Sequence, residues 1–219
     1  MDKLRLRFEK TDRAIYISHL DLMHTMQRAF SRAGYELKYS EGFNPHPQIS
    51  IALPLSVGAS SLCEIMDFKL AHEVDISQVP AKLTAVMPEG IRVVACYVAE
   101  NKPALLKYLE IEGLFEYDDR DPAAMCDALR NFYASEEIVI TKKTKRGMGE
   151  SDIKPAIKEI SFEAVEGGVK LHAIISAQEP TLNPSLLADA LSQKAPEISP
   201  DFAKFTRLET YHANMEIYR

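Results

Sequence analysis

Apolar and charged side chains alternate at the start of the chain, where Leu4, Leu6 and Phe8 are each followed by an arginine or a glutamate. This period of two predicts a strand with one buried face. From Leu22 to Ala33 the apolar positions recur at helical spacing instead, and Gly34 offers a C-terminal stop. The pattern therefore predicts a strand followed by an amphipathic helix.

The rest of the chain continues this alternation of strand and helix patterns. In the first half, strands are expected at 35–39, 48–53, 62–70 and 91–99, and a second helix is expected at 75–87. In the second half, strands are expected at 105–117, 137–143, 157–165, 169–177 and 206–218, and helices at 122–133 and 184–194. Each half is therefore interpreted as the order strand, helix, strand, strand, helix, strand, with one further strand candidate between its two helices.

That order is the signature of a ferredoxin-like βαββαβ unit of about one hundred residues. We therefore expect an α+β protein of two tandem ferredoxin-like units, residues 1–101 and 102–219, packed as one body. A length of 219 residues with 46% hydrophobic residues suits one large domain or two small domains. Cys63, Cys96 and Cys126 lie in apolar segments and are expected to be free thiols.

The net charge of −6 argues against indiscriminate binding to DNA, nucleic acid in general or an anionic membrane, although a local basic patch is compatible with it. No apolar run approaches the roughly 20 residues of a membrane span, and the charged start is unlike a signal peptide. These features predict a cytoplasmic protein.

The segment Ser40–Gln48 is the most distinctive in the chain, because two prolines, a glycine and several polar side chains make it a rigid polar loop. If 35–39 is the second strand, this loop lies near Ser18–Asp21, where the first helix is expected to begin. A single long second strand over 35–53, interrupted in the middle by the loop, would place the two segments apart.

Convergence of these segments would gather a small polar site at a helix N-terminus, which favours anions. The candidate acid–base residues are His19, His46, Asp21 and Glu41, because imidazole titrates near neutral pH and pairs with carboxylates. The candidate substrate-binding residues are Ser18, Phe43 and Asn44. The alternative is that His19 only helps to cap the helix and His46 only forms a hydrogen bond with the backbone of the proline-flanked turn. No metal is expected, because histidine and cysteine pairs with ligand spacing are missing from the sequence.

A second feature is the basic segment 142–158, which holds six basic residues and two acidic residues. Lysine and arginine contacts of this kind neutralise nucleic-acid phosphates without reading sequence. The candidate nucleic-acid-binding residues are Lys142, Lys143, Lys145, Arg146 and Lys154. The alternative is a solvated hairpin tip.

The motifs together resemble a radical-SAM-linked bacterial family, a domain of unknown function fused to or encoded beside radical SAM proteins. The resemblance is carried by Ile17–Asp21, by Ser40–Pro47, by Pro54–Gly58 with Glu64 and Asp67, and by Lys142–Lys145 leading to Asp152–Pro155. Where this family often has an Arg-Pro pair, the chain has Asn183-Pro184, so a role of that arginine does not transfer.

The resemblance implies a partner. The chain has no CxxxCxxC cluster-binding motif, so the iron–sulfur cluster and S-adenosylmethionine are expected in a separate radical SAM protein. Such domains resemble tandem ferredoxin-like proteins that handle RNA. The leading hypothesis is an accessory module that presents RNA or a ribosome-associated substrate to that enzyme. The alternative is a stand-alone acid–base enzyme, including one that cleaves RNA without a metal, using His19 and His46.

Overall fold

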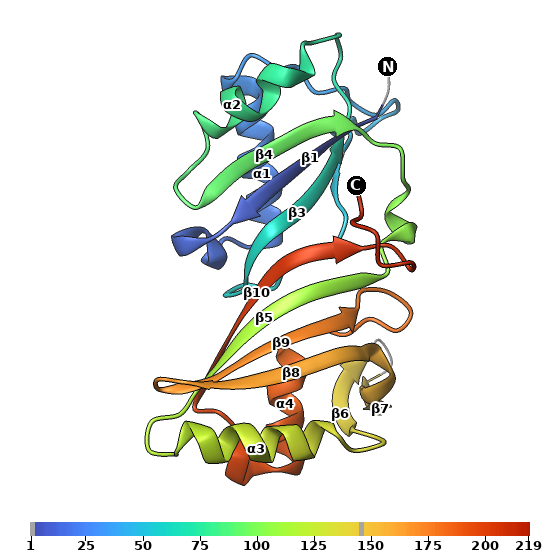
Figure 1. Ribbon diagram of the computed structural model, residues 1–219. Coiled ribbons are helices and arrows are strands. Elements are labelled where there is room, and N and C mark those ends of the chain that lie inside the picture. The colour runs from blue at the N-terminus through green and yellow to red at the C-terminus, as the bar shows by residue number, and fades with distance from the viewer. Residues whose placement is uncertain (1–2, 145–146) are drawn as a thin grey trace. The chain divides into compact units, whose positions relative to one another are not determined.

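The computed structural model describes residues 3–144 and 147–219 of an α+β protein with mostly antiparallel strands (Figure 1). In these ranges the chain forms four α-helices. It divides into two compact units, Met1–Pro103 together with Arg219, and Ala104–Tyr218. The division falls close to the expected boundary after residue 101.

The first unit is an antiparallel arrangement with two helices. Its strands are β1 (Leu4–Lys10), β2 (Ile49–Ile51), β3 (Ser60–Phe68) and β4 (Ile91–Val98), and its helices are α1 (His19–Arg32) and α2 (Val79–Thr84). The strand order is β4-β1-β3, and β2 pairs with β3. The alternation that predicted β1 is confirmed, because Leu6 and Phe8 are fully buried in a core that also holds Met26 and Phe30 of α1.

The start of α1 follows from Ser18, whose side chain accepts a hydrogen bond from the backbone N–H of Asp21. This is the expected N-terminal cap. The second helix is shorter than the predicted 75–87, because a separate 3-10 turn (Ile76–Gln78) comes first. Pro80 lies in the first turn of α2, where its missing N–H costs nothing.

The second unit repeats the strand order of the first with an added hairpin. Its elements are β5 (Tyr108–Glu116), α3 (Pro122–Tyr133), β6 (Val139–Thr144), β7 (Gly147–Asp152), β8 (Ile157–Val165), β9 (Gly168–Ser176), α4 (Ser185–Lys194) and β10 (Phe202–Tyr211). The order is β10-β5-β9-β8, with every neighbouring pair antiparallel, while β6 and β7 pair only with each other. Figure 1 shows α3 and α4 together on one side of these strands.

Several element boundaries differ from the predictions. Strand β7 was not predicted, because Gly147 and Gly149 hide the period of two in this hairpin. The final strand begins earlier and ends earlier than 206–218. The predicted strand 35–39 is not formed, and only the isolated bridges of Leu37 and Tyr39 remain of it. This last difference decides where the polar loop lies.

Candidate functional site

The second strand of the first unit is interrupted by the polar loop. Leu37 bridges Leu70 just beyond the end of β3, and β2 then continues beside β3 with Ile49 opposite Phe68. Between these two points, Tyr39 bridges Pro47 and closes the loop. The loop is therefore an excursion from one strand, which is the alternative that places it apart from the start of α1.

Hydrogen bonds within the loop fix the ring of His46. The Ser40 hydroxyl accepts a hydrogen bond from the backbone N–H of His46 at 3.1 Å and lies 2.9 Å from its Nδ1. Nδ1 also lies 3.4 Å from the carbonyl of Asn44. All described contacts of the ring nitrogens therefore involve Nδ1, and Nε2 is the nitrogen available to a ligand.

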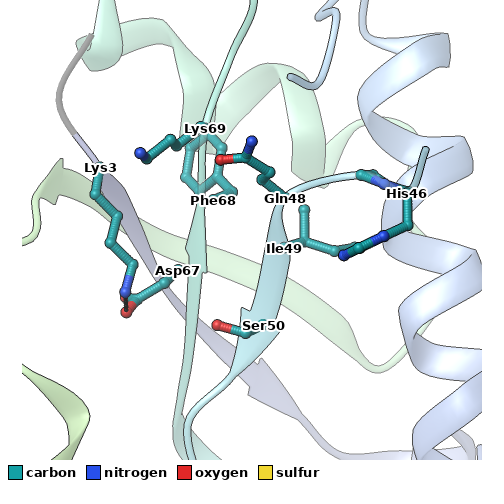
Figure 2. Close-up of a pocket in the computed structure, with 9 residues that line it drawn as sticks. Lys3, His46, Gln48, Ile49, Ser50, Asp67, Phe68 and Lys69 are labelled. Carbon is teal, nitrogen blue, oxygen red and sulfur yellow. Dashed lines mark ion pairs between the residues drawn. The ribbon is translucent and has the colours of Figure 1, made fainter. Parts of the chain in front are cut away.

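A pocket of about 200 Å³ lies where the loop rejoins β3. We call it the edge pocket, and its lining residues are Lys3, His46, Pro47, Gln48, Ile49, Ser50, Asp67, Phe68 and Lys69. Figure 2 shows Lys3 beside Asp67 at one side and His46 at the other, with Gln48 and Ile49 between them. The edge pocket is thus built from the residue before β1, the last residues of the polar loop, the start of β2 and the end of β3.

Positive charge dominates the edge pocket. The carboxylate of Asp67 is already neutralised, because Arg5 binds both of its oxygens at 2.6 and 3.0 Å and the Lys3 ammonium lies 2.6 Å away. Burial alone would raise the pKa of Asp67, but the hydrogen bonds from Arg5 and Lys3 leave the pKa below its ordinary value. Lys69 and the imidazole of His46 add further donors. This combination suits a small anionic group such as a phosphate or a carboxylate.

The predicted convergence of the loop with the start of α1 is wrong. His19 follows the end of β1, where the backbone N–H of Gly58 donates to the carbonyl of Ile15. The loop rejoins the sheet at the opposite end, where Phe68 pairs with Leu4. Helix α1 has 14 residues, which makes it about 21 Å long.

The physical reason is the interruption itself. A loop inserted at the start of an edge strand lies at the end of the sheet where that strand begins, and α1 ends there. His19 and His46 therefore do not meet at one substrate, which removes the geometry of the two-histidine mechanism.

The other residues of the predicted site lie in two separate places. Ser18 and Asp21 bind each other, with the hydroxyl donating to the carboxylate at 2.7 Å, and together they cap α1. Glu41, Phe43 and Asn44 are exposed on the loop. Only His46 among the predicted residues lines the edge pocket.

The basic segment is divided between two roles. Lys142 and Lys143 lie on β6, where Lys143 is exposed and Lys142 is half-buried. The ammonium of Lys154 instead donates to the backbone carbonyl of Tyr133 at the end of α3, which satisfies a free helix carbonyl. Lys145 and Arg146 lie outside the described residues.

Sequence reasoning missed Lys3, Lys69 and Gln48 as lining residues of the edge pocket. Asp67 is one of the residues that carry the family resemblance, and Arg5 lies in the alternating segment that predicts β1, but their pairing depends on the register of β1 against β3. The alternation of Lys3 with Leu4 places Lys3 on the same strand face as Arg5, which is the signal that could have included it.

The fold and the pocket define a two-unit α+β protein with a cation-lined site at an interrupted strand. Over residues 3–184 the sequence matches the family described as "Uncharacterized protein conserved in bacteria (DUF2344)", and the chain belongs to this family. Among curated proteins, none matches the sequence.

Solved structures show a likeness in fold. A chain of a Cbf5-Nop10-Gar1 complex matches with a TM-score of 0.53 at 11% identity, over 94% of this chain and 48% of that chain. The protein thus spans about half the length of that chain. An unknown protein from Galdieria sulphuraria matches with a TM-score of 0.27 at 10% identity, covering 94% and 98% of the two chains. The encapsulated DyP-type peroxidase from Mycobacterium smegmatis gives a TM-score of 0.20 at 10% identity, covering 96% and 91%.

Among the described residues, no three His, Cys, Asp or Glu side chains gather as they would around a metal ion. No helix in the same ranges has the length and apolar character needed to cross a membrane.

Proposed function

We propose that the protein is an RNA-binding module that presents RNA, or a ribosome-associated target, to a radical SAM enzyme. The iron–sulfur cluster and S-adenosylmethionine belong to that partner, as the family resemblance implies. At the level of the fold, each unit is ferredoxin-like, and the shared orders β4-β1-β3 with β2 and β10-β5-β9-β8 support this assignment.

The observation that carries the proposal is the exposure of Phe43 on the loop whose His46 lines a cationic pocket. Its relative exposure is 107%, the highest among the exposed large hydrophobic side chains of the described residues. A fully exposed phenylalanine loses the benefit of burial, so its presence on a braced loop needs another reason. Stacking on an unpaired base supplies that reason.

The edge pocket supplies the second half of single-strand recognition. Proteins that bind single strands combine aromatic platforms with cations that contact the phosphates. His46 follows Phe43 by three residues and lines the edge pocket with Lys3 and Lys69. In this arrangement a base stacks on Phe43 while a phosphate binds in the edge pocket. Lys142 and Lys143 provide a separate contact to the RNA backbone.

The test of stacking is the binding of a short fluorescein-labelled single-stranded RNA to the full chain, measured by anisotropy. Removing one stacking ring costs about 1–3 kcal/mol, so Phe43→Ala should weaken binding by about fivefold to a hundredfold. Phe43→Tyr should retain binding because it keeps the ring.

Phe202 offers a matched control, because it is an exposed aromatic residue of the second unit at 55% exposure. Phe202→Ala should leave RNA affinity unchanged. Equal affinities for wild type and Phe43→Ala would contradict the role of Phe43 in RNA binding.

The cationic contacts are tested by salt dependence. Each phosphate contact to a single strand contributes roughly 0.7 to the slope of log affinity against log salt. Changing Lys142 and Lys143 together to alanine should therefore lower the slope by about 1.4 if both bind phosphate. An unchanged slope would mean that Lys142 and Lys143 of the β6–β7 hairpin face solvent and do not contact RNA. The edge pocket would then be the remaining candidate for the phosphate site.

The partner is tested separately, by affinity purification of the tagged full chain from its own cells. We expect a radical SAM polypeptide, identified by mass spectrometry, together with bound RNA. Recovery of RNA without that polypeptide would support the RNA-binding role and contradict the proposed radical SAM partner.

An acid–base function of His46 alone is the second candidate, favoured by the hydrogen bond that leaves Nε2 available. It predicts cleavage of RNA by the purified protein without a partner. His46→Ala would abolish that cleavage with an unchanged circular dichroism spectrum, whereas His19→Ala would leave it intact.

A further inference from the structure

Strand β8 is the last strand of the second unit's sheet, so one side of its backbone does not pair with a strand of that sheet. Its hairpin with β9 has a two-residue turn, with Val165 opposite Gly168. Residues that flank such a turn form a hydrogen-bonded pair, and the pairs then alternate along the strands. The backbone groups of Ile160, Phe162 and Ala164 therefore point away from β9.

The direction of these groups is confirmed by one contact. Arg130 of α3 donates from its guanidinium to the carbonyl of Phe162 at 2.8 Å. For Ile160 and Ala164, the described part of the chain provides no backbone partner on this side. The edge of β8 thus offers N–H and C=O groups to an incoming strand.

A groove of about 640 Å³ runs along this edge. We call it the β8 groove, and its lining residues are Arg130, Tyr133, Ala134, Lys154, Ile157, Lys158, Glu159, Ile160, Ser161 and Phe162. One wall is the end of α3, and the other is six consecutive residues of β8. A groove that follows a strand edge fits an extended chain better than a compact ligand.

The charges in the β8 groove favour an acidic occupant. Arg130 lies at the Phe162 end, where its guanidinium also pairs with the Asp127 carboxylate at 2.8 Å. Both side chains of this pair are more than half exposed, so the pair contributes little and leaves Arg130 able to bind another carboxylate. Lys154 lies near the start of β8, where it binds the carbonyl of Tyr133. The ammonium of Lys158 lies over the ring of Tyr108 at 5.1 Å, so we do not count it as a groove contact. Glu159 is the single carboxylate among the lining residues.

We propose that the β8 groove binds an extended acidic segment of a partner protein, which adds to β8 as a further strand. Backbone hydrogen bonds to Ile160 and Phe162 hold the segment, and its carboxylates face Arg130 and Lys154. The register shift between Ile157 and Glu159 interrupts the regular ladder at the start of β8, so pairing with the segment begins at Ile160, the first outward-facing residue after it. This site lies in the second unit and does not depend on the proposed RNA function.

The experiment is a titration of the 15N-labelled full chain with an acetylated and amidated peptide of alternating glutamate and valine, followed by amide chemical shifts. Saturable shifts should appear at the amides of 157–162. A second peptide of the same sequence carries N-methyl groups on alternate residues, which removes the pairing N–H groups and keeps the charge. Its affinity should be about tenfold lower, because two or more hydrogen bonds are lost.

Two proline variants provide a matched pair on the same strand edge. Ile160→Pro removes an outward N–H within the β8 groove and leaves the ladder to β9 intact. This variant should lower the affinity for the glutamate–valine peptide by roughly threefold to tenfold. Ala164→Pro removes an outward N–H beyond the lining residues and should leave the affinity unchanged. If Ile160→Pro does not fold, the comparison of the two peptides on the wild-type chain still decides.

Four results would overturn the proposal. The first is the absence of shifts at 157–162 at millimolar peptide, and the second is equal binding of the N-methylated peptide. The third is a shift of the same amides with protein concentration alone, accompanied by a doubled mass in ultracentrifugation, which would assign the edge to a second copy. The fourth is a shift of these amides on addition of single-stranded RNA but not of peptide, which would identify RNA and not a protein segment as the ligand of the β8 groove.

Discussion

Strands β2 and β8 hold the same position in the two units, next to the third strand of each, but they end the sheet differently. Strand β2 has three residues and is preceded by the polar loop, whereas β8 has nine residues and runs without a break. The short strand exposes side chains, and the long strand exposes backbone groups. One strand order can therefore carry two different kinds of binding site.

The difference begins with proline. Pro45 and Pro47 lack an N–H and fix their own backbone, so the second strand of the first unit cannot continue through them. No proline lies within β8, and Gly167 adopts φ +75° in the turn that fixes its register with β9. Interrupted and continuous edges therefore follow from local sequence.

The sharpest test of this comparison concerns the ion pair beneath the interrupted edge. Asp67 lies opposite Ser50 of β2, and the side chains of Arg5 and Asp67 are 0% and 1% exposed. Removing one partner of a buried pair leaves an uncompensated charge, so Asp67→Ala should lower the free energy of unfolding by about 3–5 kcal/mol. Urea unfolding monitored by circular dichroism measures this change.

The control lies in the second unit, where Glu112 pairs with Lys170 and both side chains are about two-fifths exposed, at 41% and 43%. Exposed pairs contribute little, so Glu112→Ala should cost less than about 1 kcal/mol. Similar losses for the two variants would contradict the view that buried charge supports the interrupted edge.

The same ion pair predicts an acid sensitivity. The folded pKa of Asp67 lies below its ordinary value because Arg5 and Lys3 outweigh the effect of burial. The stabilisation is therefore complete above the unfolded value of about 3.9 and is lost as pH falls through the folded pKa. Urea midpoints from neutral to acidic pH should fall less steeply for Asp67→Asn, and identical slopes would refute the assignment.

A smaller effect is expected at the wall of the β8 groove. Tyr133 is 2% exposed, and its hydroxyl donates to the carbonyl of Leu187 at 2.6 Å. Burial raises the pKa of Tyr133, so the hydroxyl stays protonated and keeps this bond. Tyr133→Phe leaves a buried carbonyl without its donor, which should cost about 1–3 kcal/mol in urea unfolding.

The exposed Tyr39, which bridges Pro47 where the polar loop closes, is the matched control, and Tyr39→Phe should be neutral within about 0.5 kcal/mol. A neutral Tyr133→Phe would indicate that α3 is not held to α4 by this bond. The continuous edge would then lack the rigid wall that the β8 groove requires.

Much of the fold was predictable because most elements have a clear period. The alternation in β1 and β5, the Ser18 cap and the Asp121-Pro122 start of α3 all act within a few residues. Strand β7 was missed because glycines replace the side chains that reveal a period of two. The failure of residues 35–39 to form a regular strand was not predictable, because their pairing with β3 depends on residues distant in the sequence.

The site was predictable in part for the same reason. Composition identified the loop and His46, since prolines and polar residues act locally. It did not identify Lys3 or Lys69, because they reach the edge pocket only through the register of β1 and β2 against β3. The expected meeting of His19 with His46 failed because one local choice, an interrupted strand, moved the loop to the other end of α1.

The smallest predicted effect concerns the brace of the polar loop. Ser40 holds His46 through its hydroxyl, which contacts both the backbone N–H and Nδ1. Ser40→Ala removes these bonds at an exposed position, so the free energy of unfolding should fall by only about 0.5–1.5 kcal/mol. The ring of His46 should nevertheless lose its fixed orientation, and RNA affinity should fall by roughly threefold to tenfold if Nε2 contacts phosphate.

The control is Ser50→Ala, which removes a hydroxyl of the edge pocket outside the loop and tests whether the loss of any hydroxyl there lowers RNA affinity. An RNA affinity unchanged by Ser40→Ala, with amide exchange in 40–47 also unchanged, would mean that the prolines alone shape the interrupted edge.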